Sequence, residues 1–495
     1  MSSRLPAIFS IFRRLARVAF AVLLAGAVSG QAKPKWLKVE TPEFTIYSDA
    51  SEKQVAACAV EYAAFRRALG ELFVQPGHAL PPSVMILYRS QSSFEDLIGR
   101  APDKAGLTRV NFEAEIDGTP YSTFAIAGDR RHALSLTFEF ETIWALRRIG
   151  YYVPVWMSQG AGQVLSELSV YQGKCLVGSM REHSHRSEYG WPRFFEIGET
   201  SAVYNDPDQL GDYLSQAWGL MHWILFQDGA TRARFTDLAG RLGHTSAIDA
   251  VAAVMQTPPD QFNRAISRHL SHFSGAREVA FDEAAVRAGL HFTAAPEAEI
   301  LAQTSNLLVA SDQAYRGDTQ IDRAHELDPD LPAVRDAWAR RLLREGRQQE
   351  AIEAYRAAIE AGTRNYFAYI LSAKARLDDV SSGGRDVAGE GGLPASAAAD
   401  ELRQAIKLNP GGLRAYHELG RAFFVMPTVT EDNVAELTPG VVPGADGVLV
   451  RFYRALLYDR LNQADRYRAE LKAVVDDPDA GEQLRRTAAA RLARK

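Results

Sequence analysis

A short motif recurs in the last third of the chain at intervals that restrict the fold. Residues 324–329 read AHELDP and residues 405–410 read AIKLNP, and Ala358 lies 34 positions after Ala324 (358 − 324 = 34). A period of about 34 residues corresponds to two antiparallel helices, and such a pair buries its apolar face only against the next pair. The period therefore predicts an all-α stack of helix pairs over residues 298–480.

The stretch between residues 332 and 365 carries the large and small side chains that such pairs need for packing. They are Trp338, Ala339, Leu342, Gly346, Ala351, Tyr355 and Ala358. This pattern resembles the tetratricopeptide repeat (TPR). The resemblance implies a solenoid whose groove binds a protein or peptide and rarely carries out chemistry.

Two irregular stretches interrupt the period. Ala358 and Ala405 are 47 positions apart (405 − 358 = 47), and the surplus over one repeat is a Gly-rich insertion near residues 380–395, which predicts a loop. A further repeat begins near Leu413, and after a second irregular stretch residues 452–475 predict another helix pair. We expect four or five repeats, above the minimum of three that a solenoid needs, followed by a helical tail at residues 481–495.

Residues 1–32 are predicted to be a secretory signal peptide. Arg4, Arg13, Arg14 and Arg17 precede an apolar run at residues 18–28, and small residues follow it. An uncleaved membrane anchor is the alternative, but the run covers only 11 positions (28 − 18 + 1 = 11), whereas a spanning helix needs roughly 20. We expect export across the inner membrane into the periplasm, with no stable membrane anchor.

Composition limits the partners and the number of domains. The 495 residues include 56 Lys and Arg against 61 Asp and Glu, a formal charge of −5, so no basic excess indicates nucleic-acid binding. The length allows two or three domains. Cys58 and Cys175 could form a disulfide or remain free, and the position of Cys58 on the apolar stripe of a predicted helix favours a buried thiol.

Residues 36–290 have the pattern of an α+β domain. Residues 36–47 predict a strand pair, and a helix begins at Ser51 with Gln54 completing a capping box. Residues 84–88 predict a buried strand, and residues 107–126 predict a hairpin that turns at Asp117-Gly118. Another helix is predicted to begin at residues 94–97, and further helices are predicted over residues 209–226, 230–242 and 259–273.

One predicted helix of this domain has the frame of a zinc-peptidase active site without its metal ligands. In the pattern H-E-x-x-H, two histidines four residues apart bind zinc and the glutamate activates the metal-bound water. Here Phe138 and Thr142 occupy the histidine positions and Glu139 occupies the general-base position.

The following residues extend this frame. It resembles the bacterial peptidase MA-like (gluzincin-type) domain, in which a helix reading like HEYTH is followed by a proline–tryptophan stretch and an E-G-x-A helix. Pro154, Trp156, Gly160 and Ala161 fit that order, but Gln159 stands where the family has a third zinc ligand, 20 positions after Glu139 (159 − 139 = 20). The resemblance implies a zincin-like α+β fold with a degenerate active site.

Each replacement removes a ligand in a different way. Phe138 has no lone pair, Thr142 offers only a neutral hydroxyl, and Gln159 lacks the charge of glutamate. We therefore expect no metal and no cofactor, and Glu139 would have no activated water to deprotonate. The alternative is that this helix was never a metal site, which also predicts no zinc.

A relocated metal site is the competing enzymatic hypothesis. His132, His183, His185 and His222 fall within the same domain, and the second and third form the sequence HSH. Two histidines separated by one residue do not form a closed site unaided. A zinc metallopeptidase that uses Glu139 with displaced histidines is nevertheless the alternative function.

The sequence as a whole predicts an exported, non-catalytic interaction protein. It would combine a zincin-like α+β domain without zinc ligands and an all-α TPR solenoid that binds a protein or peptide in its groove. A further hypothesis is that the peptidase-like cleft captures peptides without cutting them, since capture needs only shape and hydrogen bonds.

Overall fold

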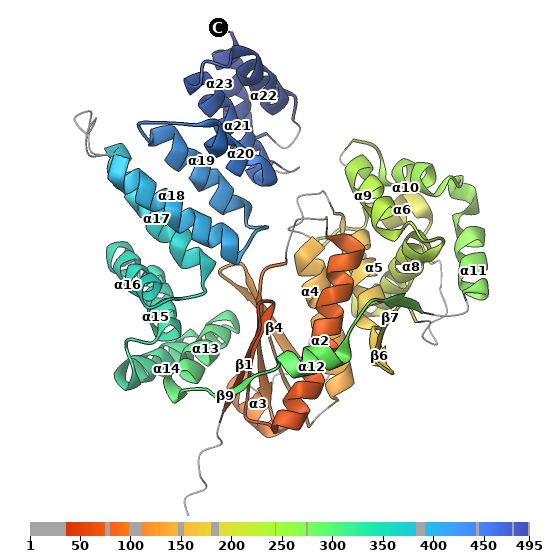
Figure 1. The fold of residues 1–495 in the computed structure, drawn as a ribbon. Coiled ribbons are helices and arrows are strands. Elements are labelled where there is room, and N and C mark those ends of the chain that lie inside the picture. The colour runs from red at the N-terminus through yellow and green to blue at the C-terminus, as the bar shows by residue number, and fades with distance from the viewer. Residues whose placement is uncertain are drawn as a thin grey trace, which may run out of the picture.

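The computed structural model describes residues 36–74, 80–98, 111–127, 129–146, 153–179, 188–242, 244–273, 276–382, 392–441, 445–477 and 480–493. The predicted signal peptide, His183, His185 and most of the Gly-rich insertion lie outside the described residues. Within them, Figure 1 shows a β-sheet with helices on both faces, a helical region beside it, and a long helical array.

The main sheet has six strands in the order β4-β5-β3-β2-β1-β9. Strands β2, β3 and β5 run parallel to one another, while the pairs β4–β5, β1–β2 and β1–β9 are antiparallel. The strand bounds are β1 Leu37–Glu40, β2 Phe44–Ser48, β3 Ser83–Tyr88, β4 Asn111–Ile116, β5 Thr119–Ala125 and β9 Phe292–Ala294. The last strand comes from a segment far later in the chain than its partner β1, so the sheet is completed only when the chain returns from the helical region.

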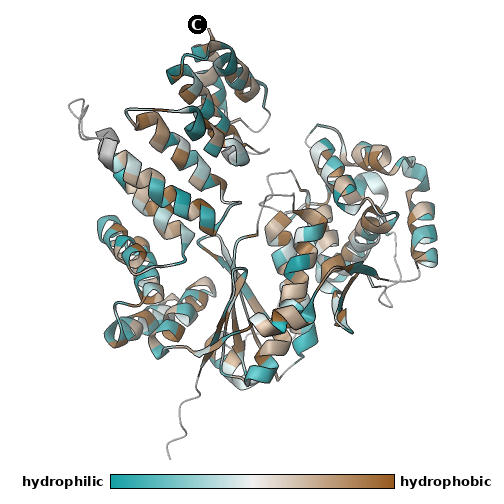
Figure 2. Cartoon of the chain, in the orientation of Figure 1, coloured by the Kyte–Doolittle hydropathy of each residue, from teal (hydrophilic) through white to brown (hydrophobic). Residues whose placement is uncertain are grey.

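The sheet is buried on both faces, and side chains alternate between them as strand geometry requires. On one face Ile46, Met85 and Phe124 join the core under helices α2 (Glu52–Phe73) and α4 (Arg130–Leu146). Side chains of the opposite face join a second core with two further helices, α3 (Gln91–Ile98) and α13 (Glu297–Ala310). Figure 2 shows the strands as mostly hydrophobic, in keeping with burial on two sides.

A helical region continues the first core beyond α4. It contains a three-stranded sheet in the order β6-β7-β8, and its helix α8 packs against both α5 and α9. The bounds are α5 Val155–Ser166, β6 Ser169–Tyr171, β7 Lys174–Val177, α6 Trp191–Glu196, α7 Ala202–Asn205, α8 Pro207–Phe226, α9 Thr231–Leu242, α10 Ala247–Met255, η1 Pro259–Gln261, α11 Phe262–His272, β8 Arg277–Val279 and α12 Glu283–Gly289.

The C-terminal part is a stack of antiparallel helix pairs. Two helices pack together within each pair: α13 with α14, α15 with α16, α17 with α18, and α21 with α22. The bounds are α14 Ala314–Leu327, α15 Pro332–Arg344, α16 Gln348–Glu360, α17 Tyr366–Ser382, α18 Gly392–Leu408, α19 Leu413–Val425, α20 Glu431–Glu436, η2 Thr438–Gly440, α21 Ala445–Arg460, α22 Ala464–Asp476 and α23 Glu482–Leu492.

The turn inside three of these pairs repeats as well. Asp312, Gly346 and Asn462 all have positive φ, at 62°, 76° and 59°, and each lies just after the first helix of its pair. The first two are 34 positions apart (346 − 312 = 34), so the period predicted from the sequence is also the period of the backbone. The left-handed conformation suits glycine and asparagine, and aspartate tolerates it.

The structure confirms the predicted mixture of a small sheet and a helical repeat array. The capping box at Ser51 and Gln54 and the turn at Asp117-Gly118 are both present. The sheet β6-β7-β8, helix α10 and strand β9 were not predicted, because such short strands and a short helix carry too little periodicity to stand out. Among the described residues, no helix is both long and apolar enough to cross a membrane.

Gly160 allows the close packing of α5 on α8. A Cβ at this position would lie 2.4 Å from the carbonyl oxygen of Ala217 and 2.5 Å from Cγ of Met221. We expect Gly160→Ala to lower the free energy of unfolding by roughly 1–3 kcal/mol, because the helices must move apart. Urea unfolding of the variant and the parent measures this.

The matched control is Gly70→Ala inside helix α2, where a Cβ would meet no atom within 4 Å. There the loss of backbone freedom in the unfolded chain should stabilise the protein by about 0.5–1 kcal/mol. Equal effects at the two positions would show that the contact between α5 and α8 is looser than described.

Candidate functional site

Phe138 lies in the hydrophobic core between α4 and α2. Its ring stacks on Phe65 with a centroid distance of 4.4 Å and an interplanar angle of 4°. The side chain is buried, so it contributes apolar contact, and an aromatic ring has no lone pair for a metal. The first of the two histidine positions of the zinc-peptidase frame is thus a packing position.

The polar groups of the frame are engaged in other bonds. Thr142 Oγ1 donates to the carbonyl oxygen of Phe138 over 2.7 Å, a bond within the same helix. Gln159 Nε2 donates to the hydroxyl of Tyr204 on α7 over 2.6 Å. Helices α4 and α5 lie side by side, with a Cβ on Gly162 only 3.0 Å from Cγ of Glu139. The structure therefore brings the two helices together but directs Gln159 toward α7.

Helix α4 also contributes Glu141 to a buried polar cluster that the sequence analysis missed. Glu141 accepts a hydrogen bond from Tyr62, and its other oxygen is 3.5 Å from Arg66 Nη1. Arg66 Nη2 also donates to the carbonyl oxygen of Pro81 over 2.6 Å. All three side chains are buried. The only sequence signal was an arginine on the apolar stripe of α2, four positions after Tyr62 and three before Leu69.

Burial determines the protonation of this cluster. Removal of water raises the pKa of Glu141 to about 7, although Arg66 and the hydrogen bond from Tyr62 act in the opposite direction. A buried ion pair recovers its desolvation cost only when its remaining polar atoms are bonded. The cluster links α2, α4 and the segment before β3, and because its side chains are shielded from water we assign it a structural role.

His222, one of the histidines considered as metal ligands, lies in the core. Its Nε2 is 3.0 Å from the carbonyl oxygen of Gly178, and its Nδ1 is 2.9 Å from Nε2 of His269. A carbonyl can only accept, so Nε2 of His222 carries the proton and Nδ1 accepts from His269. Both ring nitrogens are therefore engaged. His132 is exposed at the start of α4, and no group of three or more potential ligands is found within the described ranges.

The two cysteines are free and buried. Burial raises the pKa of both Cys58 and Cys175 to about 12, so neither thiol forms the reactive thiolate near neutral pH. Of the two interpretations of the sequence, the structure shows the unpaired one.

The array carries a row of polar side chains on its first helices. Asn306, Arg340, Lys374 and Arg421 follow one another at intervals of 34, 34 and 47 positions (340 − 306, 374 − 340 and 421 − 374), and the last interval contains the insertion. Arg340 Nη1 donates to Asn306 Oδ1 over 3.2 Å. Lys374 and Arg421 both donate to the carboxylate of Asp378, over 2.8 and 2.7 Å. We call these four residues the inner-face row.

The turn between β4 and β5 lies against this row. The carboxylate of Asp117 accepts from Arg340, and the side chains of the pair are only 17% and 13% exposed. A Cβ on Gly118 would lie 1.9 Å from the hydroxyl oxygen of Tyr366 at the start of α17. The turn thus contacts the second and third helix pairs. Burial by itself would lower the pKa of Arg340, but the charge of Asp117 raises it.

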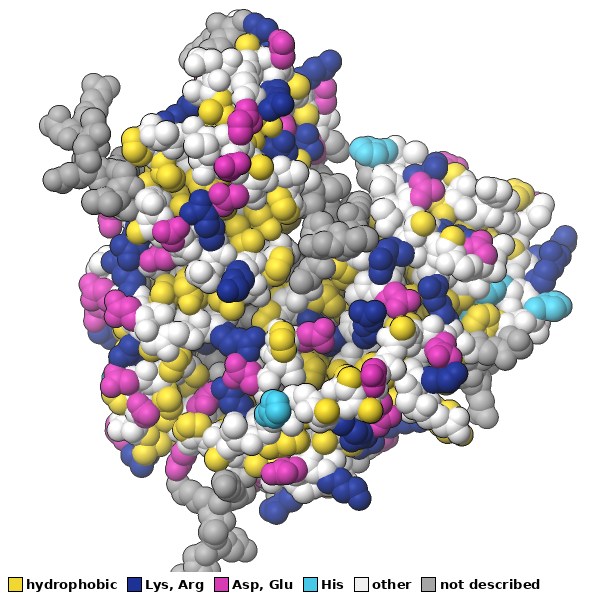
Figure 3. Space-filling view, viewed as in Figure 1, with side chains coloured by type: hydrophobic (Ala, Val, Ile, Leu, Met, Phe, Trp, Pro, Cys, Tyr) yellow, Lys and Arg dark blue, Asp and Glu magenta, His cyan; other side chains and the backbone are white. Residues whose placement is uncertain are grey.

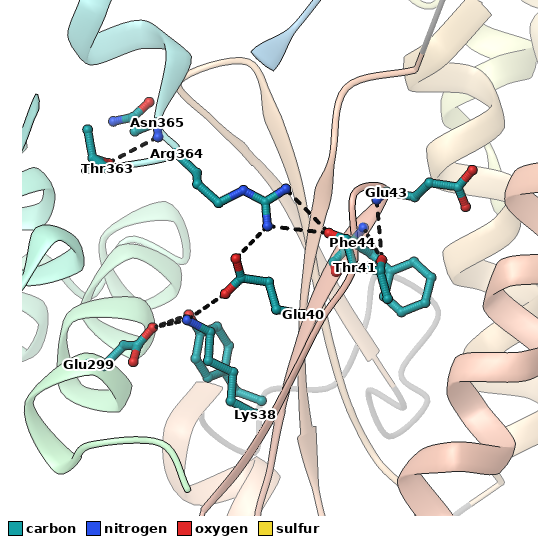
Figure 4. Close-up of polar contacts among 10 residues, drawn as sticks. Lys38, Glu40, Thr41, Glu43, Phe44, Glu299, Thr363, Arg364 and Asn365 are labelled. Atoms are coloured by element: carbon teal, nitrogen blue, oxygen red, sulfur yellow. Dashed lines mark hydrogen bonds and ion pairs between the residues drawn. The ribbon is translucent and has the colours of Figure 1, made fainter. Parts of the chain in front are cut away.

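A chain of charges joins β1 to the array beside this turn, as Figure 4 shows. Lys38 lies 2.9 Å from Glu299 on α13 and 2.8 Å from Glu40, and Arg364 reaches Glu40 over 2.6 Å. Arg364 also donates to the carbonyl oxygen of Thr41. Because these side chains remain partly exposed, each pair contributes at most about 1 kcal/mol. Their contribution is mainly to the orientation of the array.

The sequence matches no protein-family model and no curated protein. Two solved structures are similar. A thermophilic TPR protein of Thermus thermophilus is 18% identical, covers 40% of this chain and 99% of its own, and has a TM-score of 0.27. The TPR domain of P58(IPK) is 14% identical, with 58% and 82% coverage and a TM-score of 0.16. These scores carry no argument, and the array is defined by its own helix contacts and by its 34-residue period.

The His222–His269 pair predicts a pH dependence of stability. Burial lowers the pKa of His222 from 6.5 to about 4, so between these values the unfolded chain binds a proton that the folded chain does not. The free energy of unfolding should therefore fall as the pH drops from 6.5 to 4, by at most about 3 kcal/mol. His222→Gln removes this titration, and urea unfolding at several pH values measures the difference from the parent.

The comparison reports on His222 together with its partner His269, whose pKa burial also lowers. Glu141 titrates with the opposite slope, because a carboxyl whose pKa is raised on folding favours the unfolded state as the pH increases. The difference between parent and variant cancels that contribution. A constant difference between His222→Gln and the parent across this range would contradict the assignment of a neutral, buried imidazole.

The contact between the β4–β5 turn and helix α17, which we call the seat of the turn, can be tested with a matched pair of glycines. Gly118 and Gly173 have the same φ of 75°, but a Cβ on Gly173 would meet no atom within 4 Å. Both alanine variants carry the strain of the left-handed conformation, so Gly118→Ala should lose a further 1–3 kcal/mol, roughly, from its clash with Tyr366.

The second variant in this test is Tyr366→Phe, which removes the atom nearest to the added Cβ. In a double-mutant cycle it should recover part of the loss caused by Gly118→Ala and none of that caused by Gly173→Ala. Equal losses for the two alanine variants, with no coupling to Tyr366, would show that the turn does not seat on α17.

Proposed function

We propose that the chain is an exported, non-catalytic scaffold that binds a protein or peptide partner in the cell envelope. In this proposal its N-terminal part is a peptidase MA-like domain that has lost its zinc ligands, and its C-terminal part is a TPR array. The single observation that carries the proposal is the state of the three ligand positions. They hold a buried ring, a hydroxyl bonded to its own helix, and an amide bonded to another helix.

Chemistry supports the loss of catalysis. A catalytic zinc site needs three protein ligands drawn from imidazole, thiolate and carboxylate, and an open position for water. Phe138, Thr142 and Gln159 supply none of these groups. The residues present do not fit a zinc ion, so we derive no reaction for Glu139.

The array supports a binding role. Stacked helix pairs present a long continuous surface, and partners of such solenoids bind along it. At its C-terminal half the inner-face row leaves Lys374 37% exposed, and Phe424, about one helical turn after Arg421, is also 37% exposed. Aromatic residues and arginine are enriched at protein interfaces, and Phe424 and Arg421 supply one of each on this face.

Export is proposed from the N-terminal sequence, and the cysteines are compatible with it. Both thiols are buried with raised pKa values, and they lie 117 positions apart in the sequence (175 − 58 = 117). Thiolate is the species that forms disulfides. Buried neutral thiols would therefore survive in an oxidising compartment without cross-linking.

We expect the partner to bind the C-terminal half of the array's inner face, around Lys374, Arg421 and Phe424. Partners cross-linked to the full chain in its own cells would be identified by mass spectrometry and the purified partner titrated by calorimetry. The double variant Lys374→Glu with Phe424→Ala should weaken binding by about tenfold or more, because about 1.4 kcal/mol corresponds to a factor of ten.

The control removes the same side-chain types from α14, on another helix of the array. Tyr315 is 85% exposed and the Arg323 side chain is 56% exposed, so Tyr315→Ala with Arg323→Glu should leave binding unchanged. Loss of binding in the control alone would place the interface elsewhere. Retention of about one zinc per chain after desalting, with proteolysis abolished by Glu139→Gln, would replace the scaffold proposal by a metallopeptidase.

A further inference from the structure

The two halves of the inner-face row differ in what covers them. At Arg340 the neutralising carboxylate comes from Asp117, which belongs to the β4–β5 turn of the other domain. At Lys374 and Arg421 it comes from Asp378 on helix α17 of the array itself, and that side chain is 47% exposed. Figure 3 shows hydrophobic side chains gathered along the seam between the array and the sheet domain. The β4–β5 turn of the same chain therefore occupies the first half of the inner-face row, at Arg340.

The turn has the features of a bound ligand. Asp117 and Gly118 have φ values of 53° and 75°, so both central residues are left-handed, as in a type I′ hairpin turn. This geometry projects the carboxylate of Asp117 to Arg340. The missing side chain of Gly118 leaves the space that the hydroxyl of Tyr366 fills. One charged group and one absent side chain thus define which turn fits.

A hairpin turn with this backbone conformation does not need to pack against another part of the chain. The β6–β7 hairpin has the same backbone conformation, with φ values of 51° at Gln172 and 75° at Gly173. There an added Cβ would meet no atom within 4 Å, and Gln172 is exposed. The contact at Asp117 and Gly118 therefore comes from the array, which provides a site for that residue pair.

The turn is also not what holds the two domains together. Ile300, Leu307 and Leu308 of α13 are buried with Tyr47 and Ile86 of the sheet. Burial of several large apolar side chains holds α13 to the sheet, whereas the largely buried Asp117–Arg340 pair loses much of its mutual attraction to the desolvation of its two charges. The turn can therefore leave its seat while the array remains attached to the sheet.

We infer that the β4–β5 turn is a built-in ligand of the array, and that the partner presents an Asp-Gly reverse turn which competes for the seat formed by Asn306, Arg340 and Tyr366. This inference rests on the proposed function and specifies its ligand. The partner's carboxylate replaces Asp117 at Arg340, and its glycine admits Tyr366. The seated turn keeps the first half of the row closed until such a competitor binds.

Thiol labelling of the full chain tests this inference, because Cys58 and Cys175 are buried and unreactive. Asn306 is 8% exposed, so Asn306→Cys should react slowly with a polymer-linked maleimide while the turn is seated. Adding Asp117→Lys places like charges together and should raise the labelling rate at least about tenfold by opening the site. An excess of a cyclic peptide with the sequence of residues 111–125 should then slow the labelling at position 306 again.

Matched controls make each outcome decisive. The same peptide with asparagine at the position of Asp117 should not protect, Gln172→Lys should not accelerate labelling, and Lys374→Cys should react rapidly in every background. If Asp117→Lys disturbs folding by circular dichroism, Asp117→Asn removes the carboxylate and leaves Arg340 in place to bind the peptide. Unchanged labelling at position 306, or acceleration that the peptide does not reverse, would overturn the inference. Partner capture through Lys374 and Phe424 would still stand in that case, so the two proposals fail separately.

Discussion

The structure depends on the burial of its main sheet from both sides. Strands β2, β3 and β5 direct alternate side chains into two different cores, and water would reach one of these unless helices covered it. One cover, α2 with α4, comes from the N-terminal region. The other cover is α3 together with α13, which is the first helix of the repeat array. The array is therefore part of the sheet's own packing and is held to it by hydrophobic contact.

This shared helix determines which part of the array's inner face lies against the sheet domain. Docking α13 on the sheet brings the first helices of the next pairs toward the β4–β5 turn, and Arg340 of the inner-face row then meets Asp117. The charges on β1 add orientation at the same seam (Figure 4). The first half of the row is in contact with the β4–β5 turn, whereas Lys374 in the second half, and Phe424 close to it in the array, remain partly exposed.

The N-terminal core shows how a helix can keep the spacing of a site while its side chains serve packing. Phe138 fills space against Phe65, and Thr142 and Gln159 satisfy hydrogen bonds within and between helices. The buried charge of α4 lies instead at Glu141, inside the core with Arg66 and Tyr62. The sequence drew attention to Glu139 because spacing relative to a motif is visible in one dimension. It gave no comparable signal for Glu141, whose partners lie on helix α2, far earlier in the chain.

The sequence by itself determined the local elements and the repeat. The repeat period, the capping box at Ser51, the alternation of the strands and the turn at Asp117-Gly118 are all local patterns, and the backbone follows them because each is set by residues near one another in the chain. Only the tertiary structure decided that β9 pairs with β1, that α13 completes the burial of the sheet, and that Arg340 meets Asp117. These contacts join segments that are far apart in the chain, and their partners are selected by packing and charge in three dimensions, which no local periodicity records.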